Sequence, residues 1–246
     1  MWRTIQASFA SPHHPDTCLD SVRACSRDDG LTLLCVADGA GDEATSLRAS
    51  RLAAQLAQES FLRLAATSSR ELLGTLKVLV AHVTEKFFEI TGSDPVHDNN
   101  YNTTLAIALL ADDWIALASV GDAFAVLATE HDFDLVLCPD RPAGVSSPAA
   151  YMIADWIEHT QYVSVWDPGA RCLLLSTDGL EKFLVYRSVA ATDGVRKQVP
   201  FGVNKYLSNA IDQFATGKEE LGLEAIGRPD VRSFKSDDVG IAVGYR

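Results

Sequence analysis

The sequence predicts an α+β fold in which mainly antiparallel strands are covered by helices packed outside the sheets. Two observations carry this prediction. Short apolar runs typical of strands follow one another with only turn residues between them, which leaves no room for crossover helices. Helical spacing of apolar residues is confined to two long stretches near the start and shorter ones near the end. Since neither a repeat nor a linker interrupts this pattern, we expect a single domain over residues 1–246.

The first part of the chain is predicted to form a hairpin followed by two long helices. Two β-type runs between Val22 and Ala37 flank Asp28-Asp29-Gly30, a turn signal that favours a hairpin. After Gly39-Ala40-Gly41, apolar residues at helical spacing continue through Leu64. A second helix is expected from about Ser69 to Ile90.

The middle of the chain is predicted to be mostly strands. Residues 91–102 form a polar, turn-rich loop that leads into the apolar run TTLAIALL. The runs WIALASV, AFAVLA and DFDLVL follow in quick succession, and this spacing suits an antiparallel meander. After a second loop at 139–150, YVSVW and RCLLLST resume the strands across the turn Asp167-Pro168-Gly169.

The last part of the chain alternates short helices and loops before a final strand. A short helix is expected after Asp178-Gly179, and 201–216 is expected to be helical. The pattern of 185–200 favours no element, and 217–236 has the composition of a charged loop. VGIAVGYR closes the chain as a strand.

The composition excludes several classes of function. The 21 Lys and Arg against 33 Asp and Glu give a formal net charge of −12, which repels nucleic acids and anionic membranes. No apolar run approaches the roughly 20 residues that span a bilayer, and the opening residues lack the layout of a signal peptide. Five widely spaced cysteines, an odd number, are typical of reduced thiols in a core. We therefore expect a cytoplasmic protein with no nucleic-acid or membrane partner.

Three acidic residues stand at the ends of strongly apolar strands. Asp38 follows LTLLCVA, Asp178 follows RCLLLST, and Asp237 precedes VGIAVGY. Any one Asp-Gly pair is more typical of a solvated turn. In combination, carboxylates mounted on separate strand ends can converge on a hard cation such as Mg²⁺ or Mn²⁺, which prefers oxygen ligands.

Five segments in order resemble one known family. VADGAG, YNTTLAIAL, ASVGDAFAVL, LLLSTDGLEKF and SDDVGIAVGY are similar to the motifs of the type 2C, or PPM, metal-dependent serine/threonine protein phosphatases, and closest to their compact bacterial branch. The resemblance runs from about Ala7 to Tyr245. It implies an α-β-β-α sandwich, two antiparallel sheets with helices on the outer faces, which agrees with the strand pattern.

The resemblance also implies a site and a reaction. Asp38 would bridge two Mn²⁺ or Mg²⁺ ions, and Gly39 would offer its carbonyl to one of them. Asp178 and Asp237 would complete the other site, while Asp20 would hold a metal-bound water. Two such cations lower the pKa of water for in-line attack on a phosphate monoester, so no protein nucleophile is required. Asp38, Asp178 and Asp20 are the expected catalytic residues. The implied substrate is a phosphoprotein, such as a serine/threonine kinase or its target. The protein is expected to be a monomer.

Several positions depart from the pattern of the family. Leu19 stands where many members carry Glu or Gln, and ASPHHPDTCLD lacks the arginine that grips substrate phosphate. His13 or His14 is a candidate to replace this arginine, although exposed histidines in a loop are more often simply solvated. Lys182 and Asn99 at or near two further acidic positions argue against a third ion, unless Asp98 shifts into register.

Neighbouring residues leave some roles open. Asp122 in VGDAF is expected to form a turn, and Asn102 replaces the glycine before Thr103-Thr104. Asp238 follows Asp237, and either is a possible ligand.

Three alternative functions match part of the sequence. Gly39 to Ala44 fits a dinucleotide-binding fingerprint, but the long helical pattern that follows lacks the required second strand. Asp132 begins an aspartyl-nucleophile pattern, D-x-D-x-V, but stands in mid-chain at a hairpin turn. The third alternative is a catalytically weak or inactive phosphatase-like module that binds a partner, motivated by Lys182 and the missing arginine. The resemblance further implies that 185–200, which contains Arg187, Arg196 and Lys197, is a variable flap beside the site that tunes substrate choice.

Overall fold

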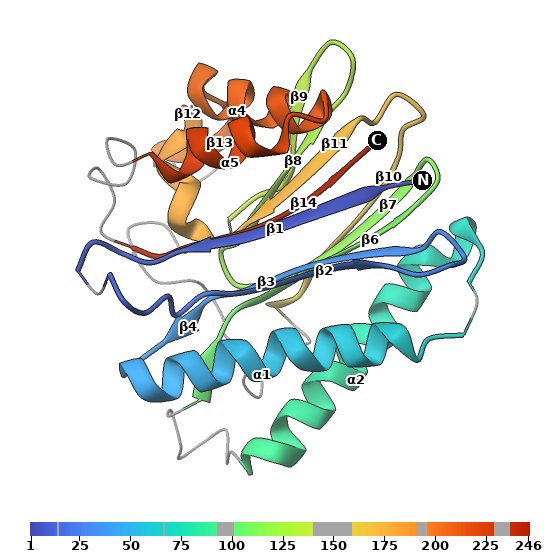
Figure 1. The fold of residues 1–246 in the computed structure, drawn as a ribbon, viewed down its shortest axis with the longest axis vertical. Helices are drawn as coiled ribbons and strands as arrows, with labels where there is room; N and C mark the ends of the chain where they lie inside the picture. Colours follow the sequence, from blue (N-terminus) through green and yellow to red (C-terminus); the bar gives the residue numbers. More distant parts are fainter. Residues whose placement is uncertain (14, 66, 93–100, 140–158, 191–195, 229–236) are drawn as a thin grey trace.

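Two five-stranded antiparallel sheets pack face to face, with helices on both outer faces (Figure 1). The computed structural model describes residues 1–13, 15–65, 67–92, 101–139, 159–190, 196–228 and 237–246. This architecture confirms the α+β prediction and the α-β-β-α order of layers.

The first sheet contains the predicted hairpin. Its strands in spatial order are β10 (Gln161–Trp166), β7 (Trp114–Val120), β6 (Leu105–Ala111), β3 (Thr32–Ala37) and β2 (Ser21–Ser26). The turn between β2 and β3 ends at Gly30, whose φ of 85° is the left-handed conformation that glycine adopts without strain. Every residue of β3 is buried: Leu33 and Cys35 face the helices, while Leu34 and Val36 face the other sheet.

The second sheet places the two ends of the chain side by side. Its strands in spatial order are β1 (Arg3–Phe9), β14 (Val239–Tyr245), β11 (Cys172–Ser176), β8 (Phe124–Ala128) and β9 (Phe133–Leu137). Arg3 pairs with Tyr245, so the termini emerge together (Figure 1). The sequence assigned no strand to β1, whose burial alternates only weakly.

Helices cover both outer faces. α1 (Glu43–Leu62) and α2 (Leu72–Thr91), preceded by the 3₁₀ turn η1 (Ser69–Glu71), pack on the first sheet as predicted. α4 (Lys205–Ala215) and α5 (Glu219–Gly227) pack on the second sheet. The hydroxyl of Tyr206 on α4 donates to the carbonyl of Ala225 on α5. The expectation of a charged loop at 217–236 is therefore wrong where α5 lies, because its buried face rests on only Gly222 and Ile226 and gives a weak helical signal.

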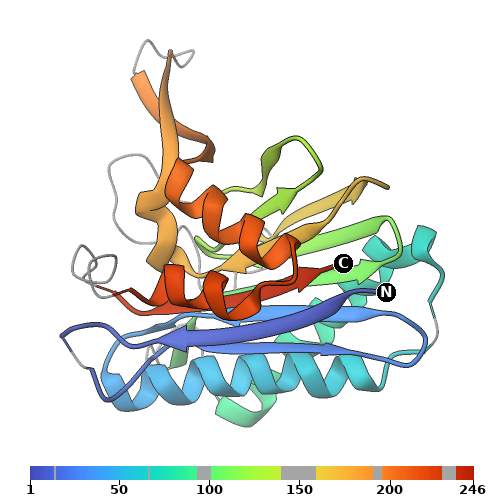
Figure 2. The same cartoon turned by 45° about the horizontal axis from the view of Figure 1, so that its top comes forward.

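Two small sheets lie at the edge of the sandwich. β4 (Gly39–Ala40) pairs with β5 (Asn102–Thr103). β12 (Leu184–Ala190) pairs with β13 (Arg196–Val203) in a hairpin that follows the 3₁₀ turn η3 (Asp178–Phe183) and extends away from the body of the molecule (Figure 2). This hairpin occupies the stretch to which the sequence assigned no element. The side chains of Arg196 and Lys197 lie outside what the structure describes.

The predicted meander is wrong at one point. β7 pairs with β6 in the first sheet, but β8 pairs with β9 and β11 in the second. The chain changes sheets at Gly121, whose φ of 111° allows the sharp turn. Strand spacing alone cannot distinguish a hairpin from such a crossing, because both need only a short turn.

The cysteines are free thiols, but the prediction that they lie in the core is right for only two of them. Cys35 and Cys172 are buried, while Cys18, Cys25 and Cys138 are partly exposed. Among the described helices, none combines the length and apolarity that crossing a bilayer requires.

Candidate metal centre

Four aspartates stand next to strand ends of both sheets, at the end of the sandwich where β4 lies, and the other three act electrostatically on Asp38. Figure 1 shows the ends of these strands. Asp38 directly follows β3, and Asp178 follows β11 after one residue. Asp20 directly precedes β2, and Asp237 lies two residues before β14. The antiparallel order of each sheet brings these strand ends to one edge.

Asp38 is the electrostatic centre of this group. Burial raises its pKa well above the usual value, and the negative charges of the surrounding carboxylates raise it further. These neighbours act in the order Asp20, Asp178, Asp237 and Asp122. The structure therefore brings together all four carboxylates that the sequence nominated, and it adds Asp122, which the sequence assigned to turn formation.

Two threonines hold the backbone of Asp38. Its N–H donates to Thr104 Oγ1 at 3.0 Å, and its carbonyl accepts from the Thr104 N–H at 2.8 Å. The same carbonyl accepts from Thr103 Oγ1 at 2.9 Å. Asn102 lies in strand β5, where it pairs with Ala40, and it does not adopt the left-handed conformation of a turn.

Gly39 has no room for a side chain. A Cβ at this position would lie 2.3 Å from the carbonyl oxygen of Ser46 in the first turns of α1. Asp42 caps the helix by accepting the Thr45 N–H at 3.1 Å. The helix start is thus packed directly against the backbone that follows Asp38, and glycine is required for that close approach.

Asp20 is held from the opposite sheet. Its Oδ2 accepts the hydroxyl of Thr177 at 2.6 Å, and that hydroxyl in turn accepts the Gly240 N–H at 2.9 Å. Asp20 is only 5% exposed. Sequence reasoning missed Thr177, which only its place just before Asp178 would have suggested.

Asp237 and Asp238 have different environments. Asp238 is buried, and its two carboxylate oxygens accept the backbone N–H groups of Ser11 at 2.5 Å and Leu19 at 2.6 Å. Asp237 is exposed, and its negative charge raises the pKa of Asp38. It also accepts the Asp238 N–H at 2.9 Å. Of the two neighbours, Asp237 is therefore better placed to be a ligand, while Asp238 fixes the loop that carries Asp20.

The departures from the family pattern are partly visible. At Leu19, hydrogen bonds of the backbone fix the chain. The Leu19 N–H donates to Asp238, and the Leu19 carbonyl accepts from Ser50 Oγ at 2.5 Å. Lys182 is exposed, with Nζ 5.3 Å from the centre of the Phe183 ring, and partial desolvation lowers its pKa. His13 is exposed as well. The predictions for His14, Asp98 and Asn99 lie outside the described residues.

The residues fit divalent cations in donor type and in charge. The four charged groups that raise the pKa of Asp38 most are all carboxylates, and a cation would relieve their mutual repulsion. Within the described ranges, no three Asp, Glu, His or Cys side chains are positioned to hold an ion as they stand. Mg²⁺ and Mn²⁺ keep several water ligands, so a partial protein ligand set is compatible with such ions.

Comparison with known proteins agrees with this fold. A family profile described as Protein phosphatase 2C matches residues 13–213. A search of curated proteins finds no match to the chain. The serine/threonine phosphatase PstP/Ppp of Mycobacterium tuberculosis is 18% identical, with a TM-score of 0.65 over 99% of this chain and 98% of that one.

Two further solved structures show the same likeness of fold. The serine/threonine phosphatase of S. agalactiae is 14% identical, with a TM-score of 0.64 over 100% of this chain and 99% of that one. PppA of Pseudomonas aeruginosa, described as a key regulatory component of T6SS, is 17% identical, with a TM-score of 0.63 over 99% and 97%.

The family profile and the fold define a protein of the phosphatase class. Since the family profile covers most of its length, the chain belongs to the protein phosphatase 2C family.

Proposed function

We propose that this protein hydrolyses phosphoserine and phosphothreonine in proteins, using two Mn²⁺ or Mg²⁺ ions at the carboxylate centre. The observation that carries the proposal is the concentration of negative charge around Asp38 from four other aspartates on separate elements. Such a cluster costs folding free energy unless a cation offsets it. A scaffold that only binds a partner has no need of it.

Individual residues have distinct tasks in this proposal. Asp38 would contact both ions, with Gly39 offering its carbonyl and Asp178 and Asp237 completing the set. Asp20, oriented by Thr177, would hold a water molecule through its carboxylate. When bound, the two ions supply a lowered pKa for water and neutralise the charge of the phosphate.

Water is the proposed nucleophile because the nearby thiol is unsuited to the task. Burial raises the pKa of Cys18 to about 12, and the charges of Asp20 and Asp238 contribute to this rise. At neutral pH the group is therefore a thiol, whereas the thiolate is the nucleophilic form.

The competing proposal is a weak or inactive phosphatase-like module that binds a partner. It is favoured by Lys182 at the further acidic position and by the absence of an arginine in ASPHHPDTCLD. The sequence-based expectations of one domain, a monomer, a cytoplasmic location and a phosphoprotein partner belong to the active-enzyme proposal.

Phosphate release from a phosphothreonine peptide distinguishes the two. The assay would be run with Mn²⁺, with Mg²⁺ and with a chelator, alongside Asp178→Asn. Turnover that requires metal and is lost in the variant supports the enzyme. Metal binding by calorimetry without turnover supports the binding module.

A further inference from the structure

A pocket of about 430 Å³ lies beside the carboxylate centre. Its walls come from β1, β2, α1 and the loop before β2. Asp20 lines the pocket, and the charge of the same residue raises the pKa of Asp38. The pocket and the candidate metal centre therefore share a residue, and ligands in the two would lie next to each other.

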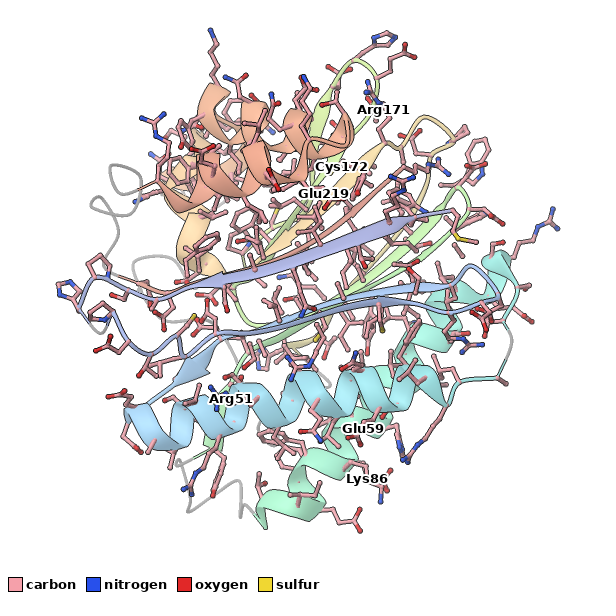
Figure 3. All side chains as sticks on the ribbon, in the orientation of Figure 1. Arg51, Glu59, Lys86, Arg171, Cys172 and Glu219 are labelled. Carbon is pink, nitrogen blue, oxygen red and sulfur yellow. The ribbon has the colours of Figure 1, made fainter. Side chains whose placement is uncertain are left out.

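Two arginines from adjacent elements line this pocket. On β2, Ser21, Arg23 and Cys25 alternate toward α1, since Ser21 Oγ lies 3.1 Å from Ser50 Oγ. Arg51 follows Ser50 on α1, in the half of the helix nearer to β4 (Figure 3). The packing of α1 on β2 thus brings both arginines to the lining of one cavity.

Neither guanidinium is neutralised by a carboxylate in the part of the chain that the structure describes. Arg23 Nη1 donates to the carbonyl of Val22 at 2.8 Å, and Arg51 makes no hydrogen bond or ion pair with a described residue. Asp16 and Asp20 line the same pocket from the loop, so a ligand must bring its negative charge to the side of the arginines. On a chain with a net charge of −12, two such cations in one cavity favour an anionic ligand.

We propose that Arg23 and Arg51 bind an anionic group of the substrate next to the phosphorylated residue. The group is a carboxylate side chain or a second phosphoryl group, both of which match the planar fork of a guanidinium. The inference rests on the proposed function and deepens it by naming a substrate preference. It also explains how an acidic protein without an arginine in ASPHHPDTCLD holds an anionic peptide.

The test compares three phosphothreonine peptides that differ only in one flanking side chain: neutral, aspartate or a non-hydrolysable phosphonate analogue of phosphoserine. Arg51→Gln and the double variant Arg23→Gln/Arg51→Gln would be compared with the wild type for kcat/KM. Arg48→Gln is the matched control, because Arg48 is exposed on the same helix and does not line the pocket. Thermal unfolding of each variant checks that the fold is intact.

We expect Arg51→Gln to lower kcat/KM by about tenfold for the two anionic peptides, as for loss of a charge-assisted hydrogen bond. The neutral peptide should change less than about twofold, since it makes no such bond. The anionic flank with the larger loss identifies the preferred group. An equal loss on all three peptides, or an equal effect of Arg48→Gln, overturns the proposal.

A binding measurement separates this proposal from the proposed function. Fluorescence anisotropy with the same peptides, each carrying a non-hydrolysable phosphonate in place of the phosphothreonine, gives Kd for the wild type and Arg51→Gln. If no peptide is hydrolysed but the anionic peptides still lose about tenfold in affinity, the activity is wrong and the pocket stands. If the neutral peptide is hydrolysed normally and Kd does not change, the pocket is wrong and the activity stands.

Discussion

Thr177 Oγ1 donates to Asp20 Oδ2 at 2.6 Å across the boundary between the two sheets. Thr177 follows β11 in the second sheet, and Asp20 precedes β2 in the first. The same hydroxyl accepts the N–H of Gly240 on β14 at 2.9 Å. One side chain therefore sets the position of a carboxylate relative to two strands of the opposite sheet.

Replacing Thr177 with Val should impair both stability and turnover. Valine keeps the shape but leaves the Gly240 N–H and one oxygen of Asp20 without this partner, at a cost of about 1–3 kcal/mol in unfolding free energy. Urea unfolding measures the first effect and kcat on a phosphothreonine peptide the second. Thr177→Ser keeps the hydroxyl and should lie close to the wild type in both. Wild-type turnover in Thr177→Val would show that the position of Asp20 does not matter.

Asp238→Asn should lower the stability of the protein, whereas Asp237→Asn should weaken its binding of Mn²⁺. Asn at 238 would turn an NH₂ group toward one of two backbone donors, so about 1–3 kcal/mol of unfolding free energy should be lost. Asp237 is exposed and adds to the repulsion around Asp38, so its variant should lose no stability without metal but bind Mn²⁺ more weakly. Urea unfolding and calorimetric titration with Mn²⁺ measure the two properties. If the two variants exchange these effects, Asp238 is the ligand.

Gly39→Ala should disturb the centre, whereas Gly74→Ala should not. A Cβ at 39 would lie 2.3 Å from the Ser46 carbonyl oxygen, so α1 or the backbone after Asp38 must shift. We expect a lower Tm and weaker Mn²⁺ binding. Gly74 is a helical position on α2 with nothing within 4 Å of its would-be Cβ, and alanine there should stabilise the protein by up to about 1 kcal/mol. Tm by calorimetry, with and without Mn²⁺, compares them.

The sequence predicted those parts of the fold and site that depend on local pattern. The uninterrupted apolar run LTLLCVA predicted β3 as a strand, and all six of its residues are buried. Asp38, Asp178 and Asp237 were nominated because they stand together at strand ends, whereas Asp20 was nominated only from the resemblance to the family. The crossing at Gly121 and the strand β1 were missed, because pairing partners far apart in the chain decide them.

The supporting contacts of the site were also beyond the sequence. The bond between Thr177 and Asp20 joins residues separated by 157 positions, and that between Ser11 and Asp238 spans 227. Nothing in the local pattern around a threonine or an aspartate encodes such a partner, since only the packing of two sheets brings them together. The different roles of Asp237 and Asp238 likewise became visible only through burial.

The carboxylate cluster predicts a specific pH dependence for the metal-free protein. The pKa of Asp38 is raised in the folded state, so between its unfolded value, about 3.9, and the raised value the folded state binds more protons. Stability should therefore fall as pH rises through that window. Asp38→Asn cannot ionise, so without metal it should unfold at a higher temperature than the wild type at pH 7.5, and the difference should shrink toward pH 4.

Added Mn²⁺ should reverse this order. Binding to the folded wild type alone contributes about 2.7 kcal/mol at a free concentration 100 times Kd, so its Tm should rise while that of Asp38→Asn stays the same. Asp134→Asn is the matched control, because Asp134 is exposed on β9 and its replacement removes the same charge. It should follow the wild type with and without Mn²⁺. An equal Mn²⁺ shift in Asp38→Asn would mean that the ion binds nonspecifically to the acidic surface and not at Asp38.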